Sequence, residues 1–365
     1  MSISPILTQF ARIFVGVLFI FSGLIKLNDP LGFSYKLQEY ADPQILNLEF
    51  IIPYALLLAI ILVIVEVVLG VALLLGYQTK AVLWSLLAMI VLFTFLTFYS
   101  AYFNKVTDCG CFGDAIPLTP WESFTKDIIL LLLIVFLIQN KHWVRPVFSS
   151  KPLVAILLIV LLGSVYFGIH VLNHLPAWDF RAYKVGTNIP EAMSYPEDAP
   201  QPVVEYQWLF DQNGKEVTVT TMGKYPDVAG SLLSVATKTI SQGYEPPIHD
   251  FSLEQNGQDF TQELLSEEKL LLIVAYNLSN FEFDSLESLK NLIEKARSYG
   301  YLVAGVTASG PEEAMDWESA LDFPFYFCDE TALKTIIRSN PGIVVIEKGV
   351  IQQKLHWNDM NIFKE

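Results

Sequence analysis

The sequence predicts an α-helical membrane bundle followed by a soluble α/β domain, and two compositional features indicate this division. Of the 365 residues, 53% are hydrophobic and only 17% are charged, whereas soluble domains carry about 25% charged residues. Residues 1–172 hold nine basic and nine acidic residues, so residues 173–365 carry the whole formal charge of −15. This acidic half disfavours nucleic acid as a partner, because phosphate binding needs a basic surface.

Five apolar segments are candidates for membrane-spanning helices, each of which needs about 20 residues. The fourth is the weakest, because its apolar stretch 128–138 needs the polar residues 121–126 to reach that length. The first is expected to be retained rather than cleaved as a signal peptide, since no small-x-small site follows it. The four stronger segments are Ile6 to Leu27, Phe50 to Gly76, Ala81 to Phe103 and Pro152 to Leu172.

Basic residues in the connecting loops predict the orientation of these spans. The turn 78–80 and the loop 140–151 contain basic residues and no acidic ones, whereas acidic residues outnumber basic ones in 28–50 and 104–127. The N-terminus is therefore expected in the cytoplasm. After five spans, the C-terminal half is expected on the opposite side.

Two cysteines separated by one glycine, Cys109 and Cys111, lie in an outward loop. A disulfide between them would close a very small ring, and strained, exposed disulfides are labile and oxidising. The pattern favours redox exchange. A static structural disulfide and soft-metal binding by the thiolates remain open as alternatives.

Glu66 lies inside the second apolar segment, where a carboxylate is costly and faces the bundle interior or a polar partner. One interpretation is a proton relay or a ligand contact, and the other is an inter-helix hydrogen bond. Gly70, one turn later, would allow close helix approach. Counted along the segment, Glu66 is expected in the inner half of the bilayer, nearer Arg12 than Lys26.

His170 and His174 are four residues apart at the outer end of the last segment, so they share a helix face. With Cys109 and Cys111 they offer a possible tetrahedral zinc or copper site. Interfacial histidines without a metal are the alternative.

Several short motifs in the membrane half carry a family resemblance. The run from Phe21 to Pro30, followed by Tyr35, Lys36 and Tyr40, resembles the first-helix signature of DoxX-type membrane proteins. Glu66 with Gly70, and then the Cys-x-Cys segment, narrows the resemblance to the MauE-like branch. Over about residues 5–140 it implies a four-helix membrane bundle, in a bacterial inner membrane, associated with redox or disulfide maturation of exported proteins.

This resemblance also implies which residues form the site. Cys109 and Cys111 would be the redox pair, facing the periplasm. Related quinone-linked disulfide oxidases use two cysteine pairs and this membrane half has one, so a quinone is a possible cofactor and not an expected one. The other motif residues have no assigned role and are Lys26, Asp29, Lys36, Glu66, Asp108 and Asp114.

The expected domains are residues 1–145 for the bundle, 146–175 for the fifth span, 176–245 for a linker with a β-hairpin, and 246–365 for the α/β domain. The hairpin is expected within 203–221, around Asn213-Gly214. Residues 224–245 have weak helical and turn character.

From residue 246 the pattern alternates between strands and helices. Strands are expected at 250–253, 269–276, 301–306 and 324–327, with a final hairpin of 342–346 and 350–356. Helices are expected at 284–299, 312–321 and 331–338.

This order resembles a thioredoxin fold of the peroxiredoxin and TlpA type, with Pro341 at the family's cis-proline position. Redox members carry a cysteine after the first central strand, but here the sequence reads Tyr276-Asn277-Leu278-Ser279-Asn280. The remaining cysteine, Cys328, is expected to be a core residue. A degenerate domain that serves as a binding surface is therefore predicted.

Three functions follow. The first is a redox-accessory protein, with thiol–disulfide oxidoreductase activity possible, that exchanges electrons with periplasmic or membrane protein partners. The second is a non-enzymatic scaffold or subunit of a larger membrane assembly, which uses the degenerate domain for docking. The third is a metal-handling membrane protein.

Overall fold

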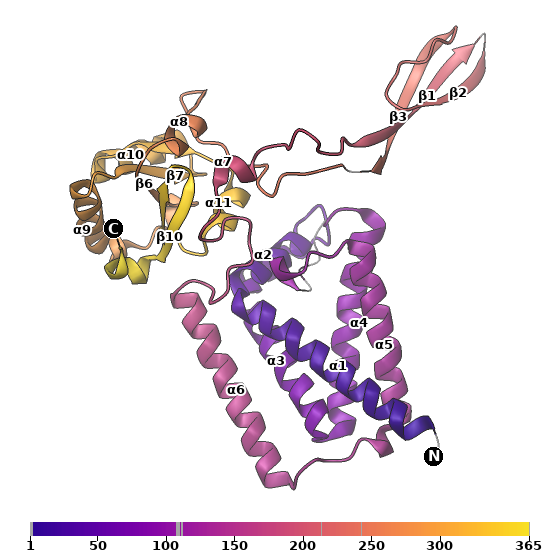
Figure 1. Cartoon of the computed structure of the whole chain (residues 1–365). Coiled ribbons are helices and arrows are strands. Elements are labelled where there is room, and N and C mark those ends of the chain that lie inside the picture. Colours follow the sequence, from indigo (N-terminus) through magenta and orange to yellow (C-terminus); the bar gives the residue numbers. More distant parts are fainter. Residues whose placement is uncertain (1–2, 107–109, 111, 213, 242, 365) are drawn as a thin grey trace.

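The computed structural model describes residues 3–106, 110, 112–212, 214–241 and 243–364. Its membrane half is a bundle of long helices, with a separate α/β domain above one end (Figure 1). The long helices are α1 (Ile3–Asn28), α3 (Ala55–Leu75), α4 (Thr79–Phe103), α5 (Pro120–Gln139) and α6 (Ser150–Asn173).

Four helical segments of the described chain are long and apolar enough to cross a membrane: Pro5–Asn28, Glu49–Leu75, Thr79–Phe103 and Ser150–Asn173. Helix α5 is not among them, because Glu122, Lys126 and Asp127 occupy its first turns. It nevertheless packs along α4 and contacts α1. A fifth crossing by α5 stays a prediction.

Small residues bring α1 and α3 into close contact. A Cβ atom added to Gly70 would lie 2.9 Å from the carbonyl oxygen of Gly16, and one added to Gly23 would lie 2.6 Å from Val67 Cγ2. Neither position has room for a side chain, because packed interiors do not yield by this much. The predicted close helix approach at Gly70 is confirmed.

Residues 30–41 form a helix, although the sequence predicts a connecting loop there. Helix α2 (Pro30–Ala41) begins with the Asp29 side chain accepting a hydrogen bond from the Gly32 amide at 2.9 Å, and Pro30 occupies its first position. Proline at that position and aspartate before it are both favourable. Helix α2 packs against the beginning of α3.

This packing corrects the expected depth of Glu66. The first turns of α3 lie beside α2, so residue 66 reaches the level of the outer end of α1. Glu66 pairs with Lys26, and Arg12 instead donates hydrogen bonds to the carbonyls of Leu73 and Leu74. The expectation that Glu66 lies nearer Arg12 was wrong, because an undetected helix shifted the register.

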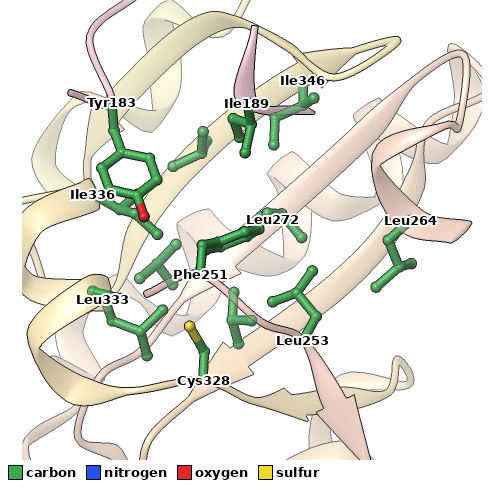
Figure 2. Packing of buried hydrophobic residues seen from close by; sticks show 14 of the residues in the cluster. Tyr183, Ile189, Phe251, Leu253, Leu264, Leu272, Cys328, Leu333, Ile336 and Ile346 are labelled. Carbon is green, nitrogen blue, oxygen red and sulfur yellow. The ribbon is translucent and has the colours of Figure 1, made fainter. Parts of the chain in front are cut away.

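The C-terminal domain is built on a seven-stranded sheet. Strand β6 is central and fully buried, pairs in parallel with β7, and pairs antiparallel with β9. Apolar clusters cover both faces, and Figure 2 shows one of them, in which Tyr183 and Ile189 pack against Phe251 and Leu272. In sheet order the strands are β10 (Val350–His356), β9 (Gly342–Glu347), β6 (Leu270–Val274), β7 (Leu302–Thr307), β8 (Phe325–Phe327), β4 (Glu254–Gln255) and β5 (Gln258–Asp259).

Helices join these strands much as the sequence predicted. The helices expected at 284–299, 312–321 and 331–338 are all found, and each differs from its expected bounds by one or two residues at one or both ends. The strand expected at 250–253 was wrong, and short strands instead flank the turn at Asn256-Gly257. The helices are α7 (Ile189–Ala192), α8 (Thr261–Leu265), α9 (Leu286–Ser298), α10 (Pro311–Leu321) and α11 (Glu330–Ile336).

A separate three-stranded sheet projects away from both halves (Figure 1). Strands β1 (Val203–Gln212) and β2 (Lys215–Thr221) form the predicted hairpin. The third strand, β3 (Ser231–Ser241), pairs with β1, whereas helical and turn character had been expected there. Its β-branched residues favour a strand, and all its residues are exposed.

Candidate functional site

The C-terminal domain contacts the membrane bundle through helix α2. Arg338, which follows α11, donates from Nε to both carboxylate oxygens of Asp29, at 3.1 and 2.9 Å. Both side chains are largely buried. A side chain at Gly32 would collide with this pair, since an added Cβ would lie 2.5 Å from Asp29 Oδ2. The N-cap of α2 is therefore also the docking point of the domain.

Electrostatics keep Arg338 charged. Burial alone would lower the pKa of its guanidinium, but Asp29, Tyr35 and Asp114 outweigh burial and raise that pKa. A charged hydrogen bond in a buried place is stronger than a neutral one. The ion pair therefore fixes the orientation of the domain on α2.

A second contact joins α2 to the loop after β6. The Tyr35 hydroxyl donates to the Tyr276 hydroxyl at 3.5 Å. The ammonium group of Lys334 lies 4.6 Å from the centre of the Tyr35 ring and 5.9 Å from that of Tyr276. Burial and Tyr276 raise the pKa of Tyr35 far above its usual range, so its phenol stays neutral. Tyr276 begins the segment from 276 to 280, which contains no cysteine.

The chain segment before β9 holds this thiol-free loop in place. The Asn340–Pro341 peptide bond is cis. The side-chain amide of Asn340 donates to the carbonyls of Asn277 and Asn280, at 2.7 and 2.9 Å. Pro341 therefore lies next to the place where the sequence analysis noted the missing cysteine. These two hydrogen bonds hold a loop that contains no cysteine.

A cavity of about 70 Å³ lies between the two halves of the molecule. It brings together four of the motif residues that had no assigned role, namely Lys26, Asp29, Lys36 and Asp114. The C-terminal part of the chain adds Trp178, Arg181 and Arg338. No local pattern singles out these last three, because they reach the cavity only through long-range folding.

A buried ion pair lies below this cavity, in the bundle. Lys26 Nζ is 2.6 Å from Glu66 Oε2, and each side chain is 4% exposed. Oε2 nevertheless has no well-aligned hydrogen bond, so Coulomb attraction holds the pair. The Lys26 ammonium also lies 4.8 Å from the centre of the Phe93 ring. Both interpretations of Glu66, an inter-helix contact and a proton or ligand site, are compatible with this geometry.

A smaller cavity of about 30 Å³ adjoins the pair. Its wall includes Lys126 and Asp127, which form an ion pair, and Thr97 Oγ1 donates to Asp127 Oδ2 at 3.1 Å. This space is large enough for a water molecule, which needs a cavity of at least about 10–15 Å³. The bundle therefore encloses a small polar space among its charged side chains.

Cys109, Cys111 and Asp108 lie outside the described residues. Gly110, which joins the two cysteines, is buried and lines both cavities. An added Cβ at Gly110 would lie 3.3 Å from Lys36 Cγ, and the residue has a φ of +64°. Glycine adopts this conformation without strain.

The other predicted residues lie elsewhere. The rings of His170 and His174 are 4.6 Å apart, and His174 Nδ1 is 2.8 Å from Asp359 Oδ1. Among the described residues no three His, Cys, Asp or Glu side chains cluster as metal ligands. Because both cysteines fall outside that set, the metal interpretation stays a prediction. Cys328 is fully buried (Figure 2), and burial raises the pKa of its thiol to about 12, as expected for a core residue.

Comparison with known proteins agrees with this division of the chain. Residues 4–139 match the family described as Methylamine utilisation protein MauE. Protein TlpB of Flavobacterium psychrophilum is 30% identical over 132 residues, which cover 34% of this chain and 35% of that protein. The chain thus spans about a third of the length of this curated relative. No solved structure matches the chain significantly.

The sheet order supplies the remaining observation. A central strand lies between a parallel neighbour reached through a helix and an antiparallel neighbour preceded by a cis proline. The chain is therefore a membrane protein with a MauE-like part at residues 4–139, followed by a C-terminal α/β region with a thioredoxin-like fold.

Proposed function

We propose that this protein is a membrane redox-accessory protein that supports thiol–disulfide exchange in exported proteins through Cys109 and Cys111. The observation that carries the proposal is the position of Gly110, which borders two cavities that also hold Lys26, Lys36 and Lys126. A nearby ammonium group favours the thiolate, which is the reactive form of cysteine, although Glu66, Glu39 and Asp127 pair with these three lysines. The site would face the periplasm, with the N-terminus in the cytoplasm of a bacterium.

The exchange involves two pairs of cysteines, Cys109 with Cys111 and a pair in the partner, and the electrons that one pair loses are gained by the other. A thiolate of the pair attacks the disulfide of a partner, whose sulfur–sulfur bond breaks as a mixed disulfide forms. The second thiolate attacks the mixed disulfide and releases the partner as a dithiol. Two electrons pass to the partner, and a Cys109–Cys111 disulfide remains. A second dithiol on the same side of the membrane restores the pair by the reverse steps.

In this proposal the C-terminal domain recruits and orients the partner. Its Tyr276 to Asn280 loop has no thiol and is held by Asn340 and Tyr35. It would supply a surface against α2, which also borders Gly110, and all sulfur chemistry would occur in the membrane half.

The test is the redox state of the pair in cells. Cells carrying the Cys328→Ala variant are quenched with acid and alkylated with a mass-shifting maleimide, so that only Cys109 and Cys111 report. We expect a mixture of oxidised and reduced protein that shifts when a reductant is added. Of the single variants Cys109→Ser and Cys111→Ser, the one that keeps the attacking thiol should trap a partner as a mixed disulfide. A pair that stays fully oxidised under every condition would contradict the proposal and indicate a structural disulfide.

A scaffold function is the second candidate, and the absence of a thiol between Tyr276 and Asn280 favours it. In that case the Cys109→Ser, Cys111→Ser double variant should retain its co-purifying partners and support normal client disulfides. Metal analysis of the same purified proteins tests the third function, since a metal-handling protein would lose bound zinc or copper in the double variant.

A further inference from the structure

The three-stranded sheet that projects from the molecule (Figure 1), called the arm here and formed by residues 203–241, has an open edge. The strand order is β2-β1-β3, so β3 (Ser231–Ser241) pairs with β1 on one side, and no strand of the described chain lies on its other side. Every residue of β3 is exposed. Such an edge presents a row of main-chain donors and acceptors that fit another strand.

Strand β3 has few of the features by which proteins prevent pairing at an edge. It contains no proline, and its 11 residues exceed the length of about five or six that is common for strands. Its one charged residue is Lys238, and Glu205 lies opposite this lysine on β1, so an acidic neighbour balances the charge within the sheet. The edge is therefore long and almost neutral.

An apolar face of the arm ends at this edge. Trp208 on β1 lies between Val219 on β2 and Val235 on β3, and Phe210 lies opposite Leu232. Phe210 is fully buried, whereas Val235 is 46% and Leu232 is 43% exposed. A further strand beside β3 would continue this face and remove apolar surface from water, which is favourable.

The distribution of charge favours a second copy of the chain as the source of this strand. Residues 173–365 carry a formal charge of −15, but the arm holds four acidic and three basic residues and so contributes only −1. Two copies that met through other parts of the C-terminal half would bring acidic surfaces together. Two arms can approach with little repulsion, because like charges are nearly absent from them.

We infer that β3 pairs antiparallel with β3 of a second copy, so that two three-stranded sheets become one sheet of six strands. A two-fold axis places one residue opposite itself, and all paired side chains must share a face. The pairing of β3 with β1 is free of register shifts over residues 234–239, which centres the axis on Ala236 or Thr237. Lys238 then faces Ser234 or Ala236 of the second copy and never the other Lys238. Neither Cys109 nor Cys111 takes part, so this inference does not rest on the redox proposal.

A cysteine scan along β3 tests the pairing and its register. Single cysteines are placed at positions 233 to 239 of the full-length chain, whose own three cysteines are replaced by alanine, and native membranes are mildly oxidised. Opposed Cα atoms in antiparallel strands are about 4.5–5.5 Å apart, which suits a disulfide. We expect a cross-linked dimer with Ala236→Cys or Thr237→Cys, little at positions two or more away, and none with Thr218→Cys on β2.

A second measurement follows the mass of the native chain in detergent as a function of its concentration. Val235→Lys introduces two like charges where the copies meet and should weaken dimerisation at least about tenfold. Val219→Lys is the matched control, because Val219 and Val235 lie on opposite sides of Trp208. This control variant should dimerise normally.

A chain that stays monomeric at every concentration, or equal effects of the two lysine variants, would overturn the inference. Cross-links spread evenly along β3 would also contradict it, because they indicate random collision. A cross-link from position 236 to another protein, and not to a second copy, would assign the edge to a foreign strand and so reject the pairing of two copies.

Discussion

The membrane bundle and the C-terminal domain both bury charged side chains, but they use them differently. In the bundle, Lys26 and Glu66 pair between neighbouring helices, where both side chains are almost fully shielded from bulk water. In the C-terminal domain, Arg338 and Lys354 pair with Asp29 and Asp179, which come from segments far away in sequence. The Lys26–Glu66 pair is required because each charge is buried in the bundle. The pairs made by Arg338 and Lys354 hold together segments that are far apart in the sequence.

The largest expected effect comes from breaking the bundle pair. Glu66→Leu leaves the Lys26 ammonium buried without its counter-ion, which should cost about 3–5 kcal/mol of stability. The double variant Lys26→Met, Glu66→Leu should recover most of this loss, because no unpaired charge remains. The measurement is the unfolding midpoint of the full-length protein in detergent.

The matched control is Glu330→Gln, which breaks the more exposed pair with Lys334 and should cost at most about 1 kcal/mol. If the double variant is as unstable as Glu66→Leu alone, then Glu66 acts through contacts other than Lys26, and the role given to the pair is wrong.

The next largest effect is a pH dependence of stability, which we expect in the C-terminal domain and not in the membrane bundle. Burial and the nearby His174 lower the pKa of His356 to about 4, although Asp359 opposes them. Its Nδ1 accepts a hydrogen bond from the Asn358 amide, so the folded domain favours the neutral ring. The unfolded chain binds a proton below about pH 6.5. Stability is therefore full above pH 6.5 and is lost as pH falls toward 4, by about 3 kcal/mol at most.

Hydrogen exchange of the full-length protein measures this loss locally. Peptides covering β9 and β10 should lose protection between pH 6.5 and 4, after correction for intrinsic exchange rates, while peptides of α1 and α3 should not. His356→Asn should flatten the slope. If His356→Asn leaves the pH dependence of protection in β9 and β10 unchanged, another titrating group causes that dependence.

A smaller effect is expected at the contact between α1 and α3. Gly70→Val would place Cβ against the Gly16 carbonyl and Ile20, and such overpacking costs about 1–3 kcal/mol. Gly163→Val on α6 is the control, because a Cβ there meets nothing within 4 Å. Equal unfolding midpoints for the two variants would show that α1 and α3 are less tightly packed than the structure indicates.

Local sequence patterns predicted the long helices and most of the C-terminal sheet. Runs of apolar residues, and the alternation of apolar and polar residues, indicate directly which side chains are buried. They did not predict α2, although Asp29-Pro30 is a favourable helix start, because the acidic residues around it suggested a loop. Because α2 was not predicted, the expected depth of Glu66 in the membrane was also wrong. Strand β3 was missed because it is exposed on every residue and so lacks the alternation that identifies a half-buried strand.

The candidate site was predicted only from the membrane side. The motifs singled out Lys26, Asp29, Lys36 and Asp114, which meet around one cavity. Arg338 reaches Asp29 across 309 positions of sequence, and no local pattern encodes such a partner. Arg181 lines the same cavity, and no local pattern singled it out either.

The docking of the thiol-free loop on α2 is the central claim, and cross-linking tests it most directly. Tyr35→Cys and Tyr276→Cys are combined in a chain whose Cys109, Cys111 and Cys328 are replaced by alanine, and a short bifunctional maleimide is added to membranes. The account predicts efficient intramolecular cross-linking, which Arg338→Gln should reduce and Arg297→Gln should not. Absence of the cross-link in the folded protein, or insensitivity to Arg338→Gln, would contradict it.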